Sequence, residues 1–178
     1  MPFATSLALT ETARDIETNV NKRIGRVFDR PTPFTKRAVF VQRASKAKLV
    51  ATVGIKDKQA EYLELQEEGG TRLPKGRALV MPVQARVNQY GNIPRKAVAR
   101  AVARPDTFAG KVKGVGGIWQ RAKAGRKRQR SIKLLYAFEA AAQYRPRFGF
   151  MDTARKTAEA RFPSQFWRAL ARAVSTAK

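Results

Sequence analysis

Hydrophobic residues recur at spacings of three and four over residues 5–30, which places them on one face of a long helix. The helix is expected to end near residues 29 and 30, because Pro31 and Pro33 cannot continue it. A second stripe at every fourth position of residues 151–177 predicts a closing helix, kinked near Pro163. The first stripe comprises Leu9, Ala13, Ile16, Val20, Ile24 and Val27, and the second comprises Phe150, Ala154, Ala158, Phe162, Phe166, Leu170 and Val174.

Between these helices, short runs rich in β-branched and aromatic residues predict strands. Residues 37–43 and 48–56 are separated by Ser45-Lys46-Ala47, a hairpin-length loop, so this pair should be antiparallel. Alternation along 48–56 puts Leu49, Ala51, Val53 and Ile55 on one face, which can pack on the first helix. Further strands are predicted at 79–83, 107–113, 117–122 and 131–139, and shorter helices at 58–68 and 94–104. This order predicts an α+β fold, with an antiparallel β-sheet packed against long N-terminal and C-terminal helices.

The 178 residues are expected to form a single domain, with a basic, loop-rich middle region at about residues 84–130. No run of 18 apolar residues occurs, so no membrane partner is expected. Residues 1–6 lack the charge and apolar core of a signal peptide. The net charge of +24 instead favours polyanions or acidic protein surfaces as partners.

The chain contains neither cysteine nor histidine. Disulfides, thiolate metal sites, histidine-ligated metals and Ser-His-Asp catalysis are therefore excluded. We expect no cofactor, no metal site and no catalytic residue.

Residues 61–68 form an acidic cluster in this basic chain: Glu61, Glu64, Glu67 and Glu68 are four of its 13 acids. The predicted helix that carries them should end at Gly69 or Gly70. Two carboxylates four residues apart share a helix face and can hold Mg²⁺, but no third carboxylate follows in a matching motif. Salt bridges within the chain, or docking on a basic neighbour, are the favoured interpretations.

Residues 72–138 hold 17 Lys or Arg against a single acid, Asp106. Contact with DNA phosphates, docking on acidic partner proteins and a merely solvated face all remain open. Any DNA contact should be independent of sequence, because no base-reading motif is present. The candidate contact residues are Lys96, Arg100 and Arg104 on the helix predicted at 94–104, and Arg126, Lys127, Arg128 and Arg130 in the hairpin tip or loop between the strands predicted at 117–122 and 131–139.

Two further groups suggest binding chemistry only superficially. Five aromatic residues near the C-terminus could stack on bases, but their helical spacing favours the core. They are Phe148, Phe150, Phe162, Phe166 and Trp167. The glycine-rich run at residues 114–117 lacks the following Lys-Ser/Thr of a phosphate loop, so a turn between strands is expected there.

The chain has a recognisable order of elements: a long helix, a hairpin, an acidic segment, a strand and a final helix. The segments that carry the resemblance are residues 62–71 (Tyr-Leu-Glu-Leu-Gln-Glu-Glu-Gly-Gly-Thr), residues 145–150 (Arg-Pro-Arg-Phe-Gly-Phe) and the helix through Phe166 and Trp167. The chain resembles the tail-completion and neck proteins of tailed bacteriophages, in particular the minor tail protein Z family. The resemblance implies a structural virion protein of the tail or neck, present in the host cytoplasm during assembly, that joins finished tails to heads. The segment at 84–130 departs from it, being longer and more basic.

The partners that the resemblance implies are further copies of the chain in a sixfold or twelvefold ring, and tail terminator, tail tube or head–tail connector proteins, with DNA in the channel as a further contact. Charge reversal at Glu64, Glu67 and Glu68 should then block assembly and leave the fold intact. The alternative is a sequence-independent nucleic-acid-binding domain, and a metal-dependent nuclease is the least favoured function.

Overall fold

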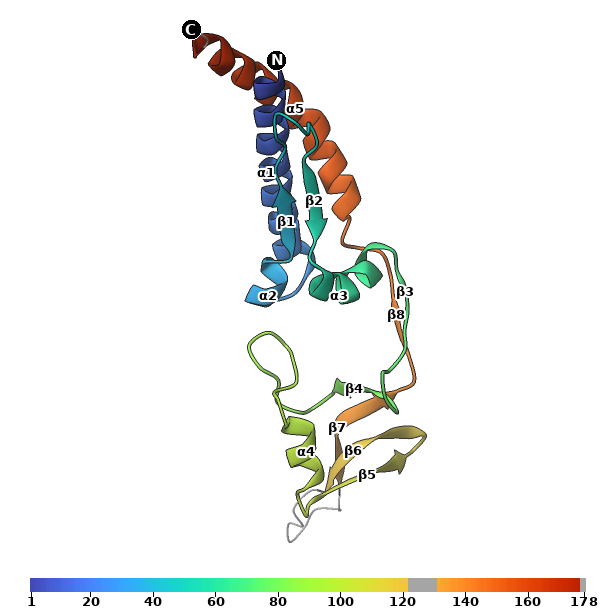
Figure 1. Ribbon diagram of the computed structural model, residues 1–178. Helices are drawn as coiled ribbons and strands as arrows, with labels where there is room; N and C mark the ends of the chain where they lie inside the picture. Colours follow the sequence, from blue (N-terminus) through green and yellow to red (C-terminus); the bar gives the residue numbers. More distant parts are fainter. Residues whose placement is uncertain (122–130, 177–178) are drawn as a thin grey trace. The chain divides into compact units, whose positions relative to one another are not determined.

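The computed structural model describes residues 1–121 and 131–176 and shows an α+β fold with antiparallel strands between two long terminal helices (Figure 1). The chain forms two compact units. The terminal unit comprises Met1–Gly69 and Arg145–Lys178, and the inserted unit comprises Gly70–Tyr144. The inserted unit therefore interrupts the chain of the terminal unit.

In the terminal unit, α1 (Pro2–Val27) and α5 (Phe150–Ser175) run antiparallel along each other (Figure 1). A short helix, α2 (Pro33–Lys36), follows α1. The hairpin of β1 (Val39–Gln42) and β2 (Thr52–Ile55) pairs antiparallel and packs on α1, and α3 (Asp57–Glu67) follows it.

The predicted apolar stripes contribute most of the core of the terminal unit, but Val174, the last member of the second stripe, is 68% exposed and lies outside it. One cluster is buried between α1, the hairpin, α3 and the start of α5. A second lies where α1 begins and α5 ends, with small α1 side chains against Phe162, Phe166 and Leu170. Helix α5 runs through Pro163. The buried members of the first cluster are Ile16, Val20, Ile24, Ala38, Val39, Leu63 and Phe148, and those of the second are Ala4, Ala8 and Ala169.

The inserted unit opens and closes with β3 (Gly70–Arg72) and β8 (Ala142–Tyr144), which pair antiparallel. Between them lie β4 (Leu79–Pro82), α4 (Ala97–Val102), β5 (Thr107–Val112), β6 (Val115–Arg121) and β7 (Ile132–Glu139). The four-stranded sheet has the antiparallel order β4-β7-β6-β5. Its core is Ala101, Ile118, Leu135 and Tyr136.

The turn between β5 and β6 consists of Lys113 and Gly114, so only the first residue of the glycine-rich run lies in the predicted turn, and residues 115–117 already belong to β6. Lys113 and Gly114 have φ values of 49° and 85°, which is the left-handed geometry that two-residue hairpin turns use. Gly117 is needed for a different reason. A Cβ there would lie 2.3 Å from the carbonyl oxygen of Tyr136 on β7. This run therefore serves strand pairing.

The single domain with one sheet that the sequence predicted differs from the observed organisation. The strands are divided among three sheets, and the terminal helices pack on the β1–β2 hairpin, while the four-stranded sheet belongs to the inserted unit. Strands β3 and β8 were missed, because three residues are too few to show a pattern. Within the middle region at 84–130, α4, β5 and β6 correspond to the helix and the two strands predicted at 94–104, 107–113 and 117–122.

Three local predictions need correction. The second strand starts at Thr52 and not at residue 48, which leaves Leu49 exposed. Trp167 is 67% exposed, so it does not belong to the core, whereas Phe148 is fully buried. Helix α4 is shorter than predicted, because Lys96 takes a left-handed conformation with φ of 61° immediately before it.

Candidate functional site

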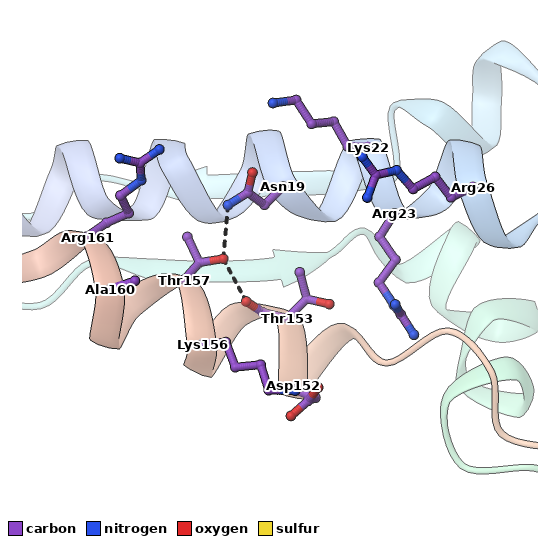
Figure 2. Close-up of a pocket in the computed structure, with 10 residues that line it drawn as sticks. All are labelled: Asn19, Lys22, Arg23, Arg26, Asp152, Thr153, Lys156, Thr157, Ala160 and Arg161. Carbon is purple, nitrogen blue, oxygen red and sulfur yellow. Dashed lines mark hydrogen bonds and ion pairs between the residues drawn. The ribbon is translucent and has the colours of Figure 1, made fainter.

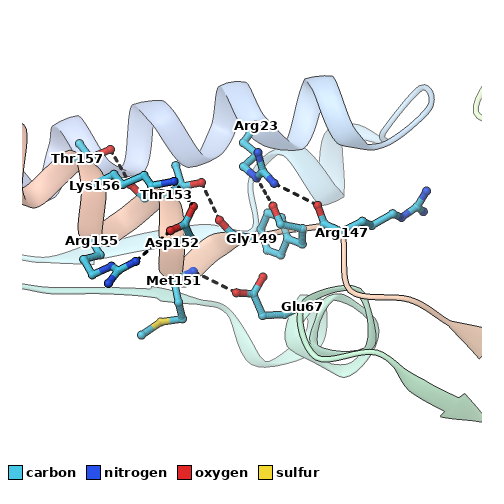
Figure 3. Close-up of polar contacts among 11 residues, drawn as sticks. Arg23, Glu67, Arg147, Gly149, Met151, Asp152, Thr153, Arg155, Lys156 and Thr157 are labelled. Atoms are coloured by element: carbon cyan, nitrogen blue, oxygen red, sulfur yellow. Dashed lines mark hydrogen bonds and ion pairs between the residues drawn. The ribbon is translucent and has the colours of Figure 1, made fainter.

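The acidic helix α3 ends against the start of α5. The Glu67 carboxylate accepts hydrogen bonds from the backbone N–H groups of Phe150 (2.7 Å) and Met151 (3.1 Å), the first two residues of α5 (Figure 3). The N-cap position itself is Gly149, which has no side chain to accept these bonds. Glu67 therefore caps a helix from 83 residues away, and its negative charge also suits the helix dipole.

The segment before α5 is held from two sides. The Gln66 backbone carbonyl of α3 accepts the N–H groups of Arg147 and Phe148, both at 2.8 Å, and its side-chain oxygen accepts Arg147 Nε at 2.6 Å. From the other side, Arg23 of α1 donates to the carbonyl oxygens of Phe148 and Arg147 (Figure 3). Gly149 has φ of 64°, and a Cβ there would lie 2.7 Å from Arg23 Nη2. The backbone conformation favours glycine here, and a larger residue would also require the Arg23 guanidinium to shift.

The four glutamates of α3 thus differ in their surroundings. Glu67 is half-buried in the contact with α5, while Glu61, Glu64 and Glu68 are exposed. Within residues 1–121 and 131–176, no three acidic side chains come together as a metal site. The Mg²⁺ interpretation therefore gains no support, and the acidic helix offers a structural carboxylate at Glu67 together with exposed carboxylates at Glu64 and Glu68.

Two of the predicted basic residues, Arg100 and Arg104, line a groove of about 510 Å³ in the inserted unit. Arg86 and Lys133 line the same groove. Lys96 lies at the N-cap of α4, one residue before the helix, so the predicted stripe of three cations on one helix does not form as such. Arg126, Lys127, Arg128 and Arg130 lie outside the described residues.

Arg104 is partly neutralised by Asp106, whose carboxylate lies 2.6 Å from Arg104 Nη2. Gln120 Nε2 donates to the same carboxylate at 2.8 Å. The hydrogen bonds from Arg104 and then from Gln120 lower the pKa of Asp106. Arg86, Arg100 and Lys133 add three further positive charges to the lining of this groove. The groove is therefore a candidate contact for phosphates or carboxylates.

A second basic groove, which the sequence did not predict, lies between α1 and α5 (Figure 2). Its cations come from two segments 130 residues apart: Lys22, Arg23 and Arg26 on α1, and Lys156 and Arg161 on α5. The signal was present in the uneven charge of the first helix. Its acids Glu11, Asp15 and Glu17 precede residue 18, and its cations gather after residue 21, with only Arg14 before it.

Comparisons with protein families, curated proteins and solved structures find no match for this chain. Across the described ranges, no helix combines the length and apolar character needed to cross a bilayer.

Proposed function

We propose that this protein is a non-enzymatic structural protein of a tailed-phage virion, located at the head–tail junction, where it assembles as a ring and joins the completed tail to the head. One observation carries the proposal. The two segments on which the resemblance rests, residues 62–71 and 145–150, are hydrogen-bonded to each other through Gln66 and Glu67. The hydrogen-bonded parts, residues 66–67 and 147–151, both belong to the terminal unit, as two linked motifs of one fold should.

The order of elements in the terminal unit supports the same proposal. A long helix, an antiparallel hairpin, a short acidic helix and a long closing helix follow one another. The acidic helix ends at Glu67 with Glu68 at its C-cap, and the next residue, Gly69, has a φ of 81°, the left-handed geometry expected of a helix-terminating glycine. The longer, basic segment that departs from the resemblance falls within the inserted unit.

The mechanism is complementarity of shape and charge. Each copy carries exposed carboxylates, including Glu64 and Glu68, together with a large excess of cations. An acidic face on one copy that docks on a basic face of the next makes a heterologous contact, and such contacts close into a ring when the rotation allows. Charge pairing of this kind sets register and association rate more than affinity.

The test is the assembly state of the purified protein and of a charge-reversed variant. Glu64→Lys with Glu68→Lys should prevent ring formation, measured by native mass and by images of the particle along its symmetry axis. Glu67 is left unchanged, because its carboxylate caps α5 and its reversal would disturb the fold. The matched control, Asp29→Lys with Glu139→Lys, makes the same charge change at exposed positions elsewhere and should still assemble. A chain that stays monomeric and never joins a larger particle would overturn the proposal.

A second function, sequence-independent nucleic-acid binding, is favoured by the charge of the inserted unit. This unit has 17 Lys or Arg against two acids, a net charge of +15, and it contains the groove lined by Arg86, Arg100, Arg104 and Lys133. Its test is the affinity for duplex DNA over a salt series. Nanomolar binding at physiological salt would favour nucleic-acid binding over the junction role. The logarithm of the binding constant should then fall steeply with the logarithm of the salt concentration, with a slope of about −0.9 for each phosphate that the protein contacts.

A further inference from the structure

The basic groove between α1 and α5 has a volume of about 490 Å³ and a single carboxylate, Asp152, among its lining residues (Figure 2). Five cations line it: Lys22, Arg23, Arg26, Lys156 and Arg161. They leave a net charge of +4 along two helices that pack against each other. Like charges held this close repel one another unless an anion lies among them.

The one carboxylate is already engaged. Asp152 lies 2.8 Å from Lys156 Nζ and 3.2 Å from Arg155 Nη2. The hydrogen bonds from Lys156 and Arg155 lower the pKa of Asp152, so it stays ionised at neutral pH. Arg23 donates to two backbone carbonyls, which are neutral and leave its charge uncompensated. The excess positive charge of the groove is thus not balanced by its own lining.

The polar floor of the groove is fixed and neutral. Asn19 Nδ2 donates to Thr157 Oγ1 at 3.1 Å, and that hydroxyl donates to the carbonyl oxygen of Thr153 at 2.7 Å. Thr153 Oγ1 in turn donates to the carbonyl of Gly149. The N-terminus of α5 is occupied by Glu67, so it does not supply the attraction either. A ligand would be held by the guanidinium and ammonium groups.

The spacing of these groups favours a chain of anions over a single one. Lys22 and Arg26 are about 6 Å apart along the axis of α1, and Lys156 and Arg161 about 7.5 Å apart along α5, at a rise of about 1.5 Å per residue. Guanidinium groups match phosphate oxygens in a bidentate geometry, and ammonium groups act as additional point charges. Phosphates repeated along a nucleic-acid strand suit such a distribution better than one carboxylate.

We propose that the groove between α1 and α5 binds consecutive phosphate groups of a nucleic-acid backbone, without reading its sequence. This site lies in the terminal unit, separate from the groove at Arg100 and Arg104. The proposal goes beyond the junction role and does not depend on ring formation, so either can fail alone. Binding here is electrostatic and weakens with salt, because each neutralised phosphate releases counterions.

Because the inserted unit also carries much positive charge, the test needs a local measurement on the full-length protein. Acylation of individual lysines, followed by mass spectrometry, is compared with and without a short DNA duplex at low salt. Lys22 and Lys156 should react about fivefold more slowly when DNA is bound. Lys48 and Lys58, exposed elsewhere in the terminal unit, should be little affected.

Two double variants localise the effect. Arg26→Glu with Arg161→Glu reverses two exposed cations of the groove and should abolish the protection of Lys22 and Lys156. Arg168→Glu with Arg172→Glu makes the same charge change at exposed positions of α5 outside the groove lining and should preserve it. Arg23 is not substituted, because it holds the segment before α5. Circular dichroism verifies that both variants fold.

Three outcomes would overturn the proposal. Protection that survives the groove variant would place the DNA elsewhere. Protection by inorganic phosphate at the same phosphate concentration, with nothing added by the duplex, would indicate an adventitious ion only. Protection that develops on self-assembly without DNA, and that DNA does not increase, would identify the groove as an interface between copies of this chain.

Discussion

Replacement of Glu67 by alanine removes the carboxylate that caps α5, and we expect it to destabilise the terminal unit by about 2 kcal/mol. Loss of an N-cap acceptor costs about 1 kcal/mol. Loss of a negative charge beside a helix N-terminus costs about another 0.5–1 kcal/mol. The two bonds, to the N–H groups of Phe150 (2.7 Å) and Met151 (3.1 Å), are short enough for both contributions to apply.

The assay is urea denaturation followed by the helical circular dichroism signal, because α1 and α5, the long helices, both belong to the terminal unit. At a denaturant dependence of about 2 kcal/mol per M, the midpoint should fall by about 1 M. Glu67→Gln keeps an acceptor and loses the charge, so its effect should be about half as large. High salt should narrow the difference between Glu67→Gln and the native protein, since salt screens the dipole contribution.

Glu68→Ala is the matched control. It removes an exposed carboxylate from the next position, at the C-cap of α3, and should change stability by less than about 0.5 kcal/mol. If Glu67→Ala and Glu68→Ala shift the midpoint equally, Glu67 does not act as a cap and the contact between α3 and α5 contributes nothing measurable.

Two further predictions concern the inserted unit. Gly117→Ala should destabilise it by about 1–3 kcal/mol, because the added methyl would lie 2.3 Å from the Tyr136 carbonyl oxygen. Gly76 has open space around it, so Gly76→Ala should be nearly neutral in the same denaturation assay. Equal effects of the two substitutions would contradict the close approach of Gly117 to Tyr136. The carboxyl of Asp106 should titrate below its usual pKa of about 3.9 in an NMR titration. Because its pKa is lowered in the folded state, the stability it contributes is present above about pH 4 and is lost as the pH falls through the folded value. Arg104→Ala should raise this pKa, and an unchanged titration would refute the assigned cause.

The elements with a strong local pattern could be predicted from the sequence. The stripe through Ile16, Val20 and Ile24 marked the buried face of α1, and alternation marked Val53 and Ile55 on β2, which pack on the same core. Strands β5, β6 and β7 were likewise located within a few residues. These features follow from the helix and strand periods alone, which neighbouring residues suffice to reveal.

The α+β class, the excess of positive charge and the exclusion of histidine and cysteine chemistry also follow from the sequence without the structure. Tertiary structure alone decided which glutamate of α3 is structural, because the partner of Glu67 lies 83 residues further along the chain. It also decided that residues 70–144 form a unit of their own, and that cations from α1 and α5 share one groove. Local patterns show which face of an element is buried, but long-range packing determines which other element that face contacts. This packing brings Glu67 of α3 against the start of α5, and it places the cations of α1 and α5 along one groove.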